Sequence, residues 1–133
     1  MDESLSAHWF DPLFRADAMR RLFSDRARLQ GILDFVAALA RAQARAGVAP
    51  VAAAAAIARQ CRAELFDIAA LSQATEMAGN SAIPIIHELT RLVASADPVS
   101  AGYVHWGATS QDAMDTGLAL QLRQGLDLMG VRF

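Results

Sequence analysis

The sequence predicts an all-α protein. Apolar side chains recur at spacings of three and four residues, which is the period of an amphipathic helix. The four prolines and eight glycines stand mainly where such helices would begin or end. No segment alternates polar and apolar residues over the length of a strand, so we expect no substantial sheet. The 133 residues are about the length of one domain.

The first long helix is predicted to begin after Ser24 and to stop at Gly47. The Ser24 hydroxyl can cap free backbone N–H groups, and Asp25 places negative charge where the helix dipole favours it. Gly47 supplies a left-handed stop, and Pro50 lies just beyond it. The apolar stripe of this helix runs through Leu29, Ile32, Leu33, Val36, Leu39 and Ala40, and the polar Gln43 breaks it at its end.

Two shorter helices are predicted next. Pro50 suits a first turn and begins a helix that runs to about Arg59. Asp67 looks like the cap of another helix over residues 68–78, and Gly79 marks its stop.

The remaining residues predict two helices joined by a loop. Pro84 opens the first of them, whose apolar side carries Ile85, Ile86, Leu89, Leu92 and Val93. Residues 95–108 hold an Asp-Pro pair and two glycines, which is typical of a loop. The last helix is expected to run from Thr109 or Ser110 to about Leu128.

The last predicted helix carries an apolar face that no later helix of the sequence can cover. The side chains on this face fall four residues apart: Met114, Leu118, Leu122 and Leu126. We therefore expect a chain that stops before its fold is complete. A small helical domain that covers this face by dimerising is the alternative.

Composition excludes several kinds of function. Twelve arginines face fourteen acidic residues for a net charge of −2, without the clustered basic excess of a nucleic-acid binder. The absence of lysine excludes a Schiff base formed by this chain. Cys61 can form no internal disulfide, and no metal-ligand spacing surrounds it. The acidic N-terminus is unlike a secretory signal, and the longest apolar run is about half a membrane span. We expect a cytoplasmic protein with no membrane partner.

Two polar loops meet predicted helix starts and are the candidate sites. Thr109 and Ser110 stand where free backbone N–H groups are exposed, so hydroxyls and amides together suit a carboxylate ligand. His105 adds a further donor. The alternative is an ordinary capping box, in which Ser or Thr caps the helix and a polar side chain reaches back. Asn80 and Ser81 form the second loop, for which a turn plus a cap is the alternative.

The residues Tyr103–Thr116 resemble the first signature region of the fumarase/aspartase superfamily. Residues 7–14, 23–30 and 78–84 are similar to the same superfamily, and the resemblance reaches to about residue 128. Within it, the chain is most similar to the bacterial cycloisomerases of 3-carboxy-cis,cis-muconate. Adenylosuccinate lyase is the nearest rival, but that enzyme usually carries histidine where this chain has Ser81. Val36 departs from the family pattern, which has glutamate there.

The resemblance implies an architecture and a reaction. Residues 1–108 would form an N-terminal helical domain, and residues 109–133 would begin the central helical bundle of a homotetramer whose sites combine three subunits. The reaction would be lactonisation of a small polycarboxylate in protocatechuate breakdown, without cofactor or metal. The substrate-binding residues would be Asn80, Ser81, His105, Thr109, Ser110 and Gln111.

The resemblance also implies that the chain alone is inactive, because the superfamily's general acid/base serine belongs to a loop far downstream. A non-catalytic helical dimerisation module is the competing hypothesis from a different class. It predicts a well-folded dimer without affinity for polycarboxylates.

Overall fold

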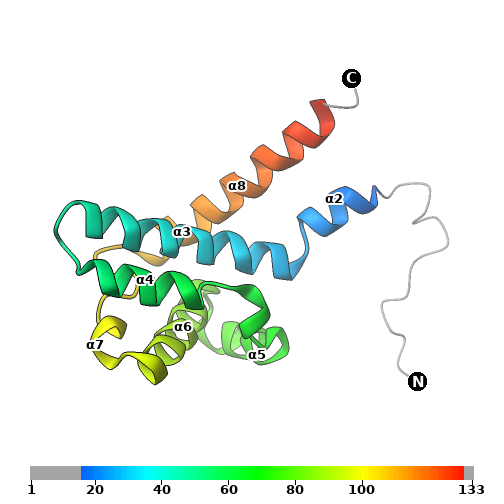
Figure 1. Cartoon of the computed structure of the whole chain (residues 1–133). Coiled ribbons are helices and arrows are strands. Elements are labelled where there is room, and N and C mark those ends of the chain that lie inside the picture. Colours follow the sequence, from blue (N-terminus) through cyan, green and yellow to red (C-terminus); the bar gives the residue numbers. More distant parts are fainter. Residues whose placement is uncertain (1–15, 131–133) are drawn as a thin grey trace.

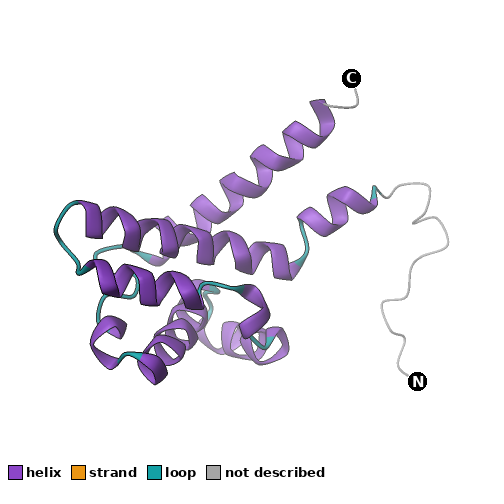
Figure 2. Cartoon of the chain, in the orientation of Figure 1, coloured by secondary structure: helices purple, strands orange, loops and turns teal. Residues whose placement is uncertain are grey.

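The computed structural model describes residues 16–130, and within that range it contains helices and no strand (Figures 1 and 2). The elements in chain order are α2 (Asp17–Leu22), α3 (Asp25–Arg45), α4 (Val51–Gln60), the 3-10 turn η1 (Ala63–Leu65), α5 (Ile68–Ala78), α6 (Ala82–Ala96), α7 (Pro98–Ala101) and α8 (Ser110–Gly130). The predicted all-α class is confirmed. Residues 7–14, which contribute to the family resemblance, and the predicted bundle residues 131–133 lie outside the described part.

Helix α3 is the centre of the fold. Ser24 caps it as predicted, since its Oγ accepts the Ala27 N–H at 3.3 Å. The helix buries its apolar stripe against α4 and α6, which contribute Ile57, Leu89 and Val93. Val36 is fully buried in this core. The core therefore lies between α3, α4 and α6, and it also includes Ala113 of α8.

The predicted start of α6 at Pro84 is wrong by two residues. The helix begins at Ala82 because the Asn80 carboxamide oxygen accepts the N–H groups of Ala82 at 2.9 Å and Ile83 at 3.3 Å. Pro84 lies in the first turn, where its missing N–H has no carbonyl partner to lose.

The expectation that residues 95–108 form a loop is also wrong in part. Asp97 accepts the N–H groups of Val99 and Ser100 at 3.1 and 3.2 Å, and this cap supports the short helix α7. Helix α2 is a further element, and it was not predicted from the sequence.

Helix α8 packs on α3 through small residues, and its second half projects beyond the core on the same side as α2 (Figure 1). The buried positions of α8 are Ala113, Gly117, Gln121 and Gly125. The Gln121 amide donates to the Leu22 carbonyl oxygen at 2.8 Å, which joins α8 to the end of α2.

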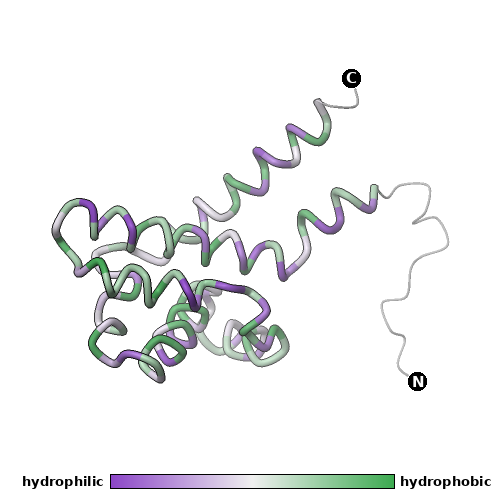
Figure 3. The backbone as a smooth tube through the Cα atoms, viewed as in Figure 1, coloured by the Kyte–Doolittle hydropathy of each residue, from purple (hydrophilic) through white to green (hydrophobic). Residues whose placement is uncertain are grey.

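The predicted apolar face of α8 is largely uncovered in the described part of the chain. Met114 packs against the core, whereas Leu118, Leu122 and Leu126 are 38%, 50% and 64% exposed. Figure 3 shows apolar residues continuing along the projecting part of this helix. Within residues 16–130, the structure offers no helix with the length and hydropathy that a membrane span requires.

Candidate functional site

The turn between α7 and α8 has an unusual backbone. His105 has a φ of 56°, and Gly107 has a φ of 74°. A residue with a side chain adopts this left-handed conformation at a cost of about 1–3 kcal/mol, and such residues concentrate at functional sites. Within the turn, the N–H groups of Trp106 and Ala108 donate to the carbonyls of Tyr103 and His105 at 3.4 and 3.3 Å.

The His105 ring is held in a partly buried environment. It meets Phe35 of α3 edge to face, with 6.2 Å between ring centroids. Its Nε2 is buried and has no hydrogen-bond partner within residues 16–130. Burial lowers the pKa of His105 below its ordinary 6.5, although the backbone of Thr109 and the carboxylate of Asp112 act in the opposite direction. The imidazole is therefore mainly neutral at pH 7.

Part of the capping-box alternative is confirmed at the start of α8. The Thr109 N–H donates to Asp112 Oδ2 at 2.9 Å, so this carboxylate reaches back to the helix start. That amide is therefore satisfied within the chain. Gln111 is exposed and its amide donates to Asp115 Oδ1 at 2.6 Å, one turn further along the helix.

Asn80 joins the two predicted site loops. Its carboxamide oxygen caps α6, as the turn-plus-cap alternative expects, while its Nδ2 donates to Ser110 Oγ at 3.3 Å. These residues are thirty positions apart in the sequence. The structure thus brings Asn80 and Ser110 into direct contact at the meeting point of two helix N-termini.

Three of the six predicted site residues line clefts, and these clefts are separate. His105 and Ser110 line a cleft of about 310 Å³ together with Ala82, Ile83, Ile86, His87 and Ala108. Ser81 lines another, of about 200 Å³, and its Oγ lies 3.5 Å from the Met114 sulfur. The structure does not bring Ser81 to the His105 cleft. The predicted residues outside both linings are Asn80, Thr109 and Gln111.

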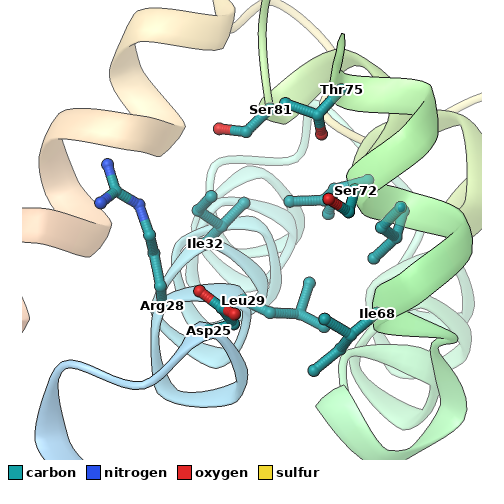
Figure 4. Close-up of a pocket in the computed structure, with 10 residues that line it drawn as sticks. Asp25, Arg28, Leu29, Ile32, Ile68, Ser72, Thr75 and Ser81 are labelled. Atoms are coloured by element: carbon teal, nitrogen blue, oxygen red, sulfur yellow. The ribbon is translucent and has the colours of Figure 1, made fainter. Parts of the chain in front are cut away.

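The cleft at Ser81 has one cationic side chain. Figure 4 shows Arg28 on one side of it and Ser81 on another, with Ser72 and Thr75 of α5 nearby. Leu29, Ile32, Ile68 and Ile85 give it apolar walls, and Asp25 also lines it. A guanidinium and hydroxyls beside apolar walls suit the binding of a small carboxylate.

Three residues at or near these clefts were not predicted from the sequence: Phe35, Gln43 and Arg28. The Gln43 amide donates to the Trp106 carbonyl oxygen at 2.6 Å. A signal for Gln43 was present, because this polar residue breaks the apolar stripe of α3. Nothing in the sequence pattern marked Phe35 as a contact of His105.

Neither a reactive thiol nor a metal-binding cluster is found among residues 16–130. Burial raises the pKa of the Cys61 thiol to about 12, with a smaller contribution from Asp34, so the thiol stays protonated and unreactive. Among residues 16–130, no group of three or more His, Cys, Asp or Glu side chains is placed to hold a metal ion.

Comparison with known proteins places this geometry in a family. A family model described as lyase matches residues 14–130. The 3-carboxy-cis,cis-muconate cycloisomerase of Pseudomonas putida is 60% identical over 120 residues, which are 90% of this chain and 28% of that enzyme. The chain thus spans little more than a quarter of this relative's length.

Solved structures agree with the sequence match. The crystal structure of the Pseudomonas putida 3-carboxy-cis,cis-muconate lactonizing enzyme superposes with a TM-score of 0.88 at 59% identity, covering 91% of this chain and 28% of that one. A fumarate lyase from Mesorhizobium sp. BNC1 gives a TM-score of 0.79 at 39% identity, covering 90% and 27%. Because the lyase model matches most of the sequence, the chain belongs to the lyase family, as its resemblance to the fumarase/aspartase superfamily implied.

Proposed function

We propose that this chain supplies the first part of the active site of a 3-carboxy-cis,cis-muconate cycloisomerase. The 60% identity to the Pseudomonas putida enzyme over 90% of the chain is the observation that carries the proposal. The reaction is an intramolecular addition in which a carboxylate oxygen bonds to one carbon of a double bond and the adjacent carbon takes up a proton from a general acid, which gives a carboxymuconolactone. The addition pushes negative charge toward the carboxylate conjugated with the other alkene carbon, so fixed donors near that carboxylate lower the barrier.

In this proposal Asn80, Ser81, His105, Thr109, Ser110 and Gln111 contact the substrate. His105 and Ser110 have the strongest support, because they line one cleft and the buried Nε2 of His105 has no partner among residues 16–130. Ser81 acts from the neighbouring cleft, where Arg28 supplies positive charge for a second carboxylate. Gln111 and Thr109 have weaker support, since Asp115 and Asp112 already accept the amide hydrogens that they offer.

The assembly we propose is a homotetramer in the cytoplasm, with residues 1–108 as an N-terminal domain and residues 109–133 as the first part of a central bundle. The exposed Leu118, Leu122 and Leu126 support this assembly, because covering a row of leucines with a second helix lowers the free energy of the protein. The active sites then combine segments of different subunits. We expect the chain by itself to be inactive, because it matches only 28% of the length of the Pseudomonas putida enzyme.

A chimeric enzyme tests the proposed activity. Residues 14–130 replace the matching segment of the Pseudomonas putida cycloisomerase, and lactonisation is followed by the loss of the conjugated absorbance of 3-carboxy-cis,cis-muconate. We expect the chimera to turn over this substrate, and we expect His105→Gln and Ser110→Ala in it to lose most of the activity. A folded chimera without activity contradicts the proposal.

The isolated chain is the matched control for the chimera. We expect no turnover from the purified 133 residues. A rate that is proportional to its concentration and is abolished by Ser110→Ala overturns the expectation that the chain alone is inactive.

A further inference from the structure

Gln43 is a polar residue at the end of an apolar helix stripe, and the structure gives it a partner. Its Nε2 donates to the Trp106 carbonyl oxygen at 2.6 Å, across 63 positions of sequence. Its Oε1 is buried. A leucine at this position would continue the stripe but would leave the Trp106 carbonyl without this donor.

The carbonyl that Gln43 binds lies at the centre of the strained turn. Trp106 stands between two residues in the left-handed region, His105 and Gly107. The backbone hydrogen bonds inside the turn are long, at 3.4 Å for Trp106 and 3.3 Å for Ala108. The shorter Gln43 contact therefore fixes the peptide that follows Trp106 from outside the turn.

The same helix also contacts the His105 ring. Phe35 and Gln43 are eight residues apart on α3, which is a little more than two helical turns. Phe35 meets the imidazole edge to face, and Gln43 holds the backbone beyond it. A rigid helix of the core thus touches the turn at two points, one on the ring and one on the main chain.

We propose that Gln43 is a positioning residue that holds the turn 105–107 in its left-handed conformation and thereby keeps the His105 imidazole at the cleft it shares with Ser110. The effect of Gln43 on the position of the His105 ring can be measured in this chain alone. Its consequence for catalysis rests on the proposed function, so the two are tested separately.

The first test is the titration of His105, followed by NMR of its imidazole protons in the 133-residue chain. The signal is identified as the one that is missing in His105→Gln. Gln43→Met keeps the shape of the side chain and removes the donor, while Gln73→Met makes the same change on the exposed surface of α5. The groups around the ring stay the same in both variants: the Thr109 backbone and Asp112 at the start of α8, His87 of α6 and Phe35 of α3.

We expect the pKa of His105 to rise toward its ordinary value in Gln43→Met, because a released turn lets water reach the ring, and to stay unchanged in Gln73→Met. If Gln43→Met is unfolded by circular dichroism, Gln43→Asn replaces it. That variant keeps the amide but is one methylene too short to reach Trp106. A folded Gln43 variant in which His105 titrates as in the parent overturns the proposal.

The second test uses the chimeric cycloisomerase. There Gln43→Met should lower kcat by roughly tenfold to a hundredfold with KM nearly unchanged, because a misplaced His105 donor loses most of its effect where negative charge develops in the transition state. A Gln43→Met chimera with parental kcat contradicts the catalytic consequence. A parent chimera that is itself inactive contradicts the proposed function, and the titration of His105 still decides the role of Gln43.

Discussion

The backbone of Gly31 in α3 lies directly against the backbone of Gly117 in α8. A Cβ added to Gly31 would stand 3.1 Å from the Gly117 carbonyl oxygen, and one added to Gly117 would stand 3.1 Å from the Ile32 nitrogen. Such close approach of two helices requires residues without side chains at the crossing. The crossing sets the direction in which α8 leaves the core, and with it the position of Ser110 relative to Asn80.

Substitution of Gly117 tests this contact. In Gly117→Ala the new methyl group meets backbone atoms that cannot turn away, and overpacking of this kind costs about 1–3 kcal/mol. The matched control is Gly125→Ala on the same helix face, where the nearest atoms are side chains at 3.4–3.6 Å. Both changes gain the same helix propensity, about 1 kcal/mol. We therefore expect Gly117→Ala to be less stable than Gly125→Ala by about 1–3 kcal/mol in urea unfolding.

Equal stability of the two variants would show that the helices can separate at the crossing without cost. It would remove the argument that the Gly31–Gly117 contact fixes the site.

The Asn80 side chain is expected to act through its carboxamide oxygen and its Nδ2, and two variants test these atoms separately. Asn80→Ala loses the acceptor that caps α6 and should cost about 1 kcal/mol of unfolding free energy. Asn80→Asp keeps that acceptor and adds a charge that the helix N-terminus favours, so it should be close to the parent in stability. It nevertheless loses the Nδ2 donor to Ser110. Chemical denaturation measures the free energy of unfolding of both variants. A loss of stability in Asn80→Asp as large as in Asn80→Ala would contradict the capping role.

The helices with local start signals could be predicted from sequence, whereas features that depend on packing could not. Ser24 and Asp67 cap their helices through side-chain contacts with residues two or three positions away, which a sequence pattern contains. The burial of Gly117 and Gly125 in α8 could not be predicted, because glycine has no apolar side chain that would mark a buried position. Gly117 is buried by the backbone of α3, and Gly125 by side chains of Met19, Leu22 and Phe23. The leucines that recur every four residues indicate the exposed stripe instead.

The loops of the candidate site could also be predicted from the sequence, whereas its backbone conformation and its second cleft could not. The resemblance identified the loops that hold Asn80 and Ser110, and the structure joins them by a hydrogen bond. The left-handed backbone of His105 could not be predicted, because only glycine usually indicates a positive φ. Arg28 lies on a surface of α3 that has no distinctive pattern, and its place beside Ser81 follows from the packing of α5 and α6.

The stability of the fold is expected to depend on pH through His105. Burial lowers the pKa of this group in the folded chain, so the unfolded chain takes up its proton first as the pH falls below 6.5. This contribution to stability is complete above pH 6.5 and is lost between 6.5 and the lower folded pKa. His105→Gln should remove this loss and His87→Gln should leave it in place, as measured by urea unfolding across this pH range. The same loss in both variants would contradict the assignment to His105.

The leucine stripe of α8 should control self-association. Leu122 is half exposed in the chain, and in an oligomer its replacement by a carboxylate would bury an unpaired charge. We expect Leu122→Glu to weaken association by about 3 kcal/mol or more, roughly a hundredfold, with helicity unchanged. Gln124→Glu is the control, because it adds the same charge about 200° around the helix, on an exposed position away from the stripe. Light scattering on a sizing column should find Gln124→Glu associated like the parent and Leu122→Glu monomeric. A parent chain that is already monomeric at high concentration would mean that the stripe needs a longer partner helix than this chain provides.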